Sequence, residues 1–172
     1  MSNLLTGAGW GDKYIHLAKE ISTWSKDPST KVGAVIIGEY GQLLSQGYNG
    51  FPRGIKDSEE RLNDRKRKYE LVVHAEMNAI YNASLTGVSL KDSTLYVYGL
   101  PICNECAKGI IQVGIKKVVA CRPKIYNTEW DKSVKVAEAL FREAEIIYLI
   151  DVEDEKESLI KVMEDMKSDW IK

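Results

Sequence analysis

Two short runs of the sequence contain residues that can bind a metal ion and move a proton. His74 and Glu76 stand two positions apart, and Cys103 and Cys106 form a Cys-x-x-Cys run about thirty residues later. One imidazole and two thiolates suit zinc, and a fourth tetrahedral position stays free for water, as catalytic zinc sites require. Zinc lowers the pKa of such a water toward neutrality. Glu76 is then placed to move protons, so the pattern predicts hydrolytic chemistry at a zinc ion.

Either run alone would permit other interpretations. A Cys-x-x-Cys run can be a redox pair or half of a structural zinc ribbon. A ribbon needs a fourth protein ligand, for which only Cys121 and His16 are left in the sequence. A redox pair leaves the His-x-Glu run unexplained. Together, the order and spacing of the runs match the His-x-Glu, Pro, Cys-x-x-Cys signature of zinc nucleobase deaminases, which is the interpretation that we favour.

The approach to the two cysteines differs slightly from that signature. Ile102 separates Pro101 from Cys103, so the loop is longer by one residue while the ligand spacing is kept. A helix is predicted from Cys103 to Val113, with Gly114 at its end. Its first turn places both thiols at i and i+3 on one face, at the positive end of the helix dipole. The dipole favours thiolates and therefore metal binding.

Composition indicates one soluble domain spanning residues 1–172. Hydrophobic residues make up 44% and charged residues 28% of the chain, and the formal net charge is −1 with a pI near 6.2. Such a balance gives no bulk attraction to nucleic acid. Three cysteines suit a reducing cytosol, and neither a signal pattern nor a membrane-spanning apolar run is present in the sequence. We expect a cytoplasmic protein with no membrane partner.

Apolar periodicity and turn residues predict the elements that position the two runs. Trp10, Tyr14, Leu17, Ile21 and Trp24 form an apolar stripe on a helix, and we expect these aromatic residues to lie in the core. The charged segment 56–70 reads as a solvated helix or subunit contact. A helix opens at His74 and runs to about Leu85, where Gly87 stops it. Further predictions are strands at 31–37, 42–46, 94–98, 116–120 and 145–150, and helices at 130–144 and about 153–170.

This order predicts a three-layer α/β/α fold around a five-stranded mixed sheet. The first two strands form a hairpin. The helix at 130–144 is a full crossover between the last two strands, which we therefore expect to be parallel.

Four runs together resemble the deoxycytidylate (dCMP) deaminases of the cytidine-deaminase superfamily. They are Lys26-Asp27-Pro28-Ser29-Thr30-Lys31-Val32-Gly33-Ala34, Gly47-Tyr48-Asn49-Gly50-Phe51-Pro52, His74-Ala75-Glu76-Met77-Asn78-Ala79-Ile80 and Cys103-Asn104-Glu105-Cys106-Ala107-Lys108. The resemblance covers about residues 10–150. The zinc motif is shared across the superfamily, whereas the Gly-Tyr-Asn-Gly run is more particular to dCMP deaminases.

The resemblance implies hydrolytic deamination of dCMP to dUMP and ammonia. Water activated by one zinc ion would attack C4 of cytosine while Glu76 moves protons to N3 and to the departing amine. By the same resemblance Asn49 would bind the sugar 3′-hydroxyl and Tyr126 would close over the nucleotide. The phosphate would be held by the loop before the first strand, at Ser25, Lys26 and Ser29.

The resemblance also implies regulation. Members of the family are hexamers activated by dCTP and inhibited by dTTP, with Mg²⁺ accompanying the triphosphate. The effector site is built around the Gly-Tyr-Asn-Gly loop, which here places Tyr48, Asn49, Gly50 and Arg53 in that role.

Several rivals remain within and outside the superfamily. A free-nucleoside cytidine deaminase usually joins its last two strands by a hairpin. A tRNA deaminase would be expected to have a basic face that binds the nucleic acid. A bifunctional riboflavin-pathway deaminase would need a second domain. From another class, the chain could be an inactive zinc-binding regulator, against which the presence of Glu76 speaks.

Overall fold

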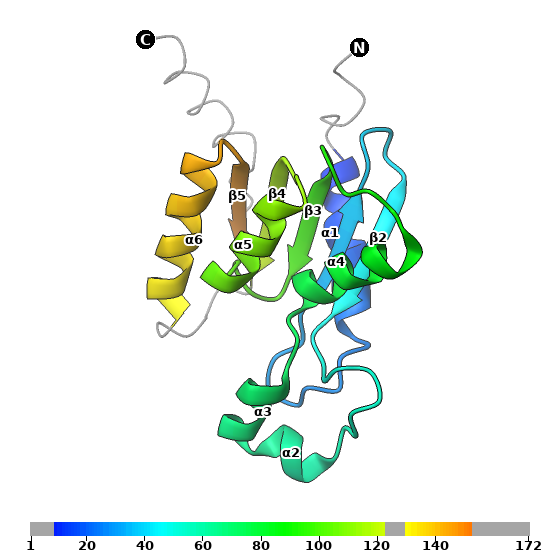
Figure 1. The fold of residues 1–172 in the computed structure, drawn as a ribbon, viewed down its shortest axis with the longest axis vertical. Coiled ribbons are helices and arrows are strands. Elements are labelled where there is room, and N and C mark those ends of the chain that lie inside the picture. Colours follow the sequence, from blue (N-terminus) through cyan, green and yellow to red (C-terminus); the bar gives the residue numbers. More distant parts are fainter. Residues whose placement is uncertain (1–8, 123–129, 153–172) are drawn as a thin grey trace.

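A five-stranded mixed sheet forms the middle layer of the computed structural model, which describes residues 9–122 and 130–152 (Figure 1). The strands run in the order β2-β1-β3-β4-β5. The strands are β1 (Gly33–Ile37), β2 (Leu43–Tyr48), β3 (Thr94–Tyr98), β4 (Lys117–Arg122) and β5 (Ile147–Val152). The helices are α1 (Trp10–Ser22), α2 (Glu59–Asn63), α3 (Arg65–Leu71), α4 (Ala75–Thr86), α5 (Asn104–Gln112) and α6 (Asp131–Glu143).

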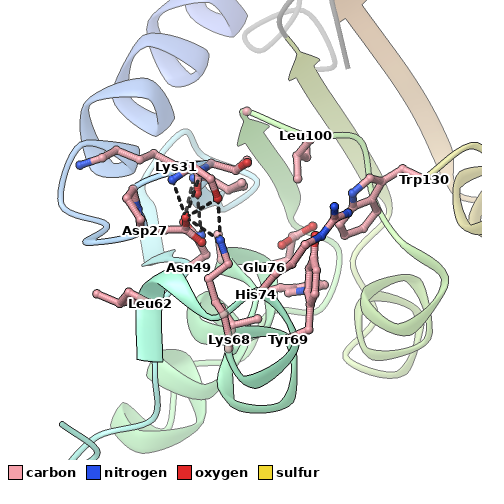
Figure 2. A pocket seen from close by; sticks show the side chains of 18 of the residues that line it. Asp27, Lys31, Asn49, Leu62, Lys68, Tyr69, His74, Glu76, Leu100 and Trp130 are labelled. Atoms are coloured by element: carbon pink, nitrogen blue, oxygen red, sulfur yellow. Dashed lines mark hydrogen bonds and ion pairs between the residues drawn. The ribbon is translucent and has the colours of Figure 1, made fainter. Parts of the chain in front are cut away.

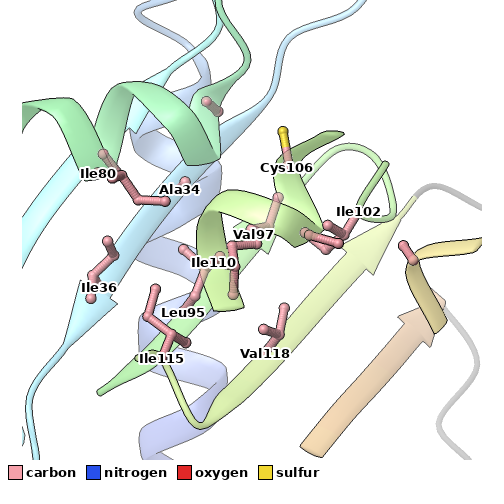
Figure 3. Close-up of a cluster of buried hydrophobic side chains, with 14 of the residues drawn as sticks. Ala34, Ile36, Ile80, Leu95, Val97, Ile102, Cys106, Ile110, Ile115 and Val118 are labelled. Carbon is pink, nitrogen blue, oxygen red and sulfur yellow. The ribbon is translucent and has the colours of Figure 1, made fainter. Parts of the chain in front are cut away.

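Helices cover both faces of the sheet, as predicted. Residues of α4, α5 and α6 share one core cluster, and α1 packs on the opposite face with a second cluster. The central strands alternate between the two: Ala34 and Ile36 of β1 enter the first cluster, and Val35 enters the second. Because both faces are covered, β1 is buried along its whole length. Figure 3 shows the first cluster beneath α5.

The parallel end of the sheet confirms the prediction made from the crossover helix. Strand β1 pairs antiparallel with both β2 and β3, whereas β3–β4 and β4–β5 are parallel. Helices α5 and α6 form the two crossovers. Parallel neighbours need such long connections because, after one strand ends, the chain must cross back to the opposite edge of the sheet before the next strand can begin. The carboxyl ends of β3 and β4 therefore point toward the same edge.

Several boundaries differ from those predicted. Strand β2 extends to Tyr48, so Gly47 and Tyr48 pair with β1 instead of starting a loop. The prediction that Trp10 and Trp24 lie in the core is wrong, because they are 49% and 50% exposed while Tyr14 and Ile21 are buried. Helix α1 ends at Ser22, so the helical spacing no longer applies at Trp24.

The segment 56–70 contains two short helices instead of one. Figure 1 shows α2 and α3 beyond one end of the sheet, on the side to which the starts of α4 and α5 point. The expected solvation is right for most of this segment, but Lys68 is buried. The predicted helix at about 153–170 and the proposed substrate residue Tyr126 lie outside the described residues. Within the described parts, no helix is long and apolar enough to cross a membrane.

Candidate active site

The three predicted metal ligands come together at the starts of two helices. His74 is the N-cap residue of α4, and Cys103 is the N-cap residue of α5 with Cys106 one turn later. The His74 Nδ1 atom lies 3.4 Å from Cys103 Sγ and 3.3 Å from Cys106 Sγ. All three ligand atoms lie within 4.8 Å of one another. Residues separated by about thirty positions therefore form one compact cluster.

The geometry of this cluster fits a tetrahedral zinc ion. Zn–S bonds of about 2.3 Å and Zn–N bonds of about 2.0–2.1 Å at a tetrahedral angle place sulfur and nitrogen about 3.5 Å apart. The observed separations of 3.3 and 3.4 Å are close to this value. Both cysteines are buried. The donor set and its spacing thus position His74, Cys103 and Cys106 as possible zinc ligands.

The electrostatics of the cluster also favour a cation. A hydrogen bond from Cys106 lowers the pKa of Cys103 to about 4, outweighing burial and helped by His74. The hydrogen bond to Cys103 raises the pKa of His74 to about 9. The pKa of Cys106 is raised, first by its bond to Cys103 and then by burial. A bound metal ion would require both thiols and the imidazole in their deprotonated forms, so metal binding at this cluster would release protons.

Glu76 lies beside the cluster in the first turn of α4. Its residue surface is 4% exposed, and burial raises the pKa of its carboxyl above the ordinary value, with the Cys103 charge adding to this and His74 opposing it. Burial therefore makes the Glu76 carboxylate a stronger base than an exposed one, because a raised pKa favours the protonated form. Glu76 is thus suited to exchange protons with a group bound at the cluster.

A cavity of about 690 Å³ opens above these residues. His74 and Glu76 line it together with Trp130, whose ring centroid is 5.8 Å from that of His74. Residues 27–32 and Asn49 form one wall, and side chains of α2 and α3 form another. Figure 2 shows Lys68 reaching from α3 toward Asp27, with Trp130 on the far side of Glu76. The volume is within the usual range for small-molecule sites.

The predicted substrate residues occupy different places around this cavity. Asn49 and Ser29 line it. The Asn49 side chain also accepts a hydrogen bond from Val32 N and donates one to Thr30 O, which fixes the adjoining loop. Ser25 is buried, and its Oγ donates to Asn49 O. Lys26 is exposed, pairs with Asp57 at 2.8 Å and does not line the larger cavity.

The predicted effector residues are also divided. Tyr48 and Gly50 line a second cavity of about 90 Å³, whereas Asn49 between them lines the larger one. The exposed Arg53 lines neither cavity, and its guanidinium donates a hydrogen bond to Asn82 Oδ1 on α4. From the last residue of β2 into the following loop, residues 48–50 therefore face the two cavities alternately.

Sequence reasoning missed three residues at the site. Trp130 was assigned only as the start of a helix, although its place beside His74 depends on the packing of α6. Asp27 and Lys68 form a buried ion pair at 3.0 Å on the cavity wall. The two residues are 41 positions apart in the sequence, so no local spacing indicates that they pair. A lysine in the middle of a charged run gives no hint that it is buried.

Fold and site together are those of an enzyme that sets a buried carboxylate beside a zinc-type ligand cluster. The chain belongs to the family described as the cytidine and deoxycytidylate deaminase zinc-binding region, whose profile matches residues 8–122. The chain is therefore a deaminase with a zinc-binding domain.

Individual relatives agree with this assignment. The uncharacterized deaminase in the luxG 3′ region of Aliivibrio fischeri is 36% identical over 136 residues, covering 78% of this chain and 88% of that protein. Human deoxycytidylate deaminase is 38% identical over 125 residues, covering 70% of this chain and 68% of that protein. The apo crystal structure of the dCMP deaminase from cyanophage S-TIM5 matches with a TM-score of 0.63 at 24% identity, covering 81% and 95% of the two chains. That structural match supports the fold.

Proposed function

We propose that this enzyme converts dCMP to dUMP and ammonia. The observation that carries the proposal is the buried Glu76 beside His74, Cys103 and Cys106 at one end of the 690 Å³ cavity. Its substrate class is supported by relatives named deoxycytidylate deaminase from several animals and from phages T2 and T4. The parallel pairing of β4 and β5 argues against the free-nucleoside alternative, which would favour a hairpin.

Glu76 performs the proton transfers in the proposed reaction. Zinc held by His74, Cys103 and Cys106 would lower the pKa of a bound water molecule and so supply the nucleophile. Glu76 receives one proton from the attacking water and delivers it to N3 of cytosine as the water oxygen bonds to C4. Glu76 then takes the remaining proton from that oxygen and passes it to the amine, so the bond between C4 and the exocyclic nitrogen breaks and uracil and ammonia leave. Burial of the Glu76 carboxyl supports this role, because a raised pKa makes its carboxylate a stronger base toward the attacking water.

The wall opposite Glu76 is proposed to hold the sugar and phosphate. Asn49 and Ser29 line that wall, which supports roles for them at the 3′-hydroxyl and the phosphate. The Ser29 hydroxyl would donate to a phosphate only after leaving Asp27. Ser25 would act through the backbone that it holds in place, because its hydroxyl is bonded to Asn49 O. Lys26 could reach a phosphate only by leaving Asp57.

Regulation is proposed at the loop after β2. A triphosphate with Mg²⁺, dCTP as activator or dTTP as inhibitor, would bind on the side of Tyr48 and Gly50 within a homo-oligomer, a hexamer by family resemblance. Support comes from the alternation along this loop: Tyr48 and Gly50 line the smaller cavity while Asn49 lines the larger. An effector that prefers one loop conformation would thereby shift the substrate wall.

The direct test is an assay of the purified protein with dCMP, deoxycytidine and cytidine, with zinc measured in the same preparation. We expect one zinc per subunit, ammonia and dUMP as products, and a kcat/KM for dCMP far above that for either nucleoside. Equal values for dCMP and deoxycytidine would move the enzyme to the nucleoside deaminases. A zinc-loaded protein that deaminates none of them would refute the proposal.

A further inference from the structure

The α2–α3 segment forms a wall of the cavity but contributes almost nothing to the apolar core. Leu62, Arg65 and Tyr69 line the cavity from this side. Among the residues of α2 and α3, all of which the structure describes, the only buried one is Lys68. A segment with so few buried apolar contacts needs another means of attachment to stay closed over a site.

Lys68 makes that attachment by crossing to the loop on the other side of the cavity. Its Nζ lies 3.0 Å from Asp27 Oδ1 and donates to Ser29 Oγ at 2.6 Å. The side chains of Lys68 and Asp27 are 10% and 8% exposed. Ser29 Oγ in turn donates to Asp27 Oδ1 at 2.8 Å. A charge pair so shielded from water, with additional hydrogen bonds, resists separation much more than an exposed one.

Asp27 is the centre of the loop that Lys68 reaches. Its Oδ1 accepts hydrogen bonds from Ser29 N at 2.8 Å and Thr30 N at 3.1 Å, besides the Ser29 hydroxyl and Lys68. Burial opposes ionisation of Asp27, but these bonds outweigh it and hold its pKa below the ordinary value. The loop is therefore an organised, anionic anchor at neutral pH.

Two other connections of this segment within residues 9–122 are an exposed ion pair and a backbone bridge at its end. Lys26 pairs with Asp57, but the Lys26 side chain is 70% exposed, and exposed pairs contribute little. A backbone bridge joins Gly50 and Val73, where the chain leaves α3 for the metal site. Only the Asp27–Lys68 pair, among the ion pairs of the described residues, joins α3 to residues 27–31.

We propose that Lys68 is a positioning residue, which fastens the α3 wall to the 27–31 loop and so holds the nucleotide cavity closed around its substrate. The proposal rests on the proposed function for its substrate, dCMP. Lys68 would act through Ser29 and the α3 side chains and not on the reacting atoms. Its loss should therefore weaken substrate binding more than the chemical step.

The test compares Lys68→Met, which keeps an unbranched side chain one atom shorter and removes the charge, with Lys68→Arg and Lys66→Met. Lys66 is an exposed neighbour on α3 that does not line either cavity, so it is the matched control. We expect Lys68→Met to raise KM for dCMP about tenfold or more with a smaller fall in kcat. Zinc content should stay unchanged in all three variants. The KM of Lys68→Arg should lie between those of Lys68→Met and the wild type, and the KM of Lys66→Met should match that of the wild type.

Hydrogen exchange without nucleotide separates this proposal from the proposed function. Amides of residues 59–71 should exchange faster in Lys68→Met than in the wild type, whatever the substrate proves to be. Asp27→Asn should speed exchange of the same amides. Agreement between the two variants would show that the effect comes from loss of the ion pair and not from misfolding of one variant. Unchanged exchange, unchanged KM, or Lys68→Arg no better than Lys68→Met would overturn the proposal. A wild type inactive on dCMP would instead refute the proposed function.

Discussion

His74 and Glu76 lie two positions apart at the start of α4, yet their surroundings favour metal binding by His74 and proton transfer by Glu76. The imidazole of His74 faces the two cysteine sulfurs, while the Glu76 carboxyl is buried beside them. Both depend on the same helix start, where the dipole favours negative charge. Metal binding and proton transfer can therefore be separated by substitution.

Glu76→Gln should keep zinc and lose nearly all turnover, because the amide preserves shape but cannot carry the proton. We expect kcat to fall by about 10²–10⁴-fold, the usual contribution of general acid–base catalysis. Zinc analysis and steady-state kinetics on the same samples measure both effects. Glu105→Gln, at an exposed residue of α5 paired with Lys108, is the control and should behave like the wild type. An active Glu76→Gln enzyme would exclude the assigned role.

Ser29 and Lys26 can be told apart as phosphate ligands. Ser29 lines the larger cavity and Lys26 does not, so Ser29→Ala should lower the preference for dCMP over deoxycytidine more than Lys26→Ala. Loss of a hydrogen bond to a charged group corresponds to about tenfold or more in kcat/KM. The measurement is the ratio of kcat/KM for the two substrates. If Lys26→Ala has the larger effect, the phosphate lies on the side of the smaller cavity.

At the scale of elements, the contact between α4 and the edge strand β2 sets the position of the candidate site residues His74 and Glu76. Helix α4 presents Ala75 and Ala79 to the sheet, and both are fully buried. Side chains complete the contact: Ser45 Oγ donates to Ala79 O, and Asn78 Nδ2 donates to Tyr48 O. Small residues and these hydrogen bonds let the helix approach the strand closely, so His74 and Glu76 follow any shift of β2.

Gly47→Ala should therefore disturb both stability and the site. A Cβ at Gly47 would lie 2.3 Å from Ala79 N and 2.5 Å from Ala75 O, which are backbone atoms of α4. We expect a loss of roughly 1–3 kcal/mol in the free energy of unfolding, as for other overpacked sites, together with lower kcat. Urea denaturation and kinetics test this. In Gly50→Ala the nearest atom would be 3.9 Å away, so its stability should be unchanged.

At the scale of the whole molecule, the two cavities share a wall. Asp27, Leu62, Lys68 and Val72 line both, and the loop after β2 contributes Asn49 to one and Tyr48 and Gly50 to the other. A ligand in the smaller cavity would contact the same residues that shape the larger one. Coupling between two such sites needs a ligand that prefers one arrangement of this shared wall.

Regulation is predicted to appear as sigmoidal dCMP kinetics that dCTP with Mg²⁺ relieves and dTTP deepens. Coupling of this kind typically changes affinity by about 5- to 150-fold. Rates across dCMP concentrations, with sedimentation to establish the oligomer, provide the measurement. Arg53→Ala or Gly50→Phe should flatten both responses without changing zinc content. Hyperbolic kinetics indifferent to both triphosphates in an intact oligomer would contradict this prediction and leave the deaminase assignment standing.

The sequence by itself predicted the candidate metal ligands, the candidate proton carrier and the parallel end of the sheet. Cys103 and Cys106 are one helical turn apart, so their common direction follows from local geometry. A helix between the last two strands likewise requires a crossover, and β4 and β5 are parallel. Each of these conclusions depends on spacing along the chain, which the sequence states directly.

Only the tertiary structure decided which residues of the same kind face the cavity. Lys68 is buried against Asp27, while its neighbour Lys66 is exposed, and the composition of the run does not distinguish them. Ser29 lines the cavity, bonded to Asp27 and Lys68, while Ser25 does not line it and is bonded to Asn49 O, although both belong to one short loop. These outcomes depend on contacts between segments far apart in the chain, because burial and charge pairing are properties of the packed molecule.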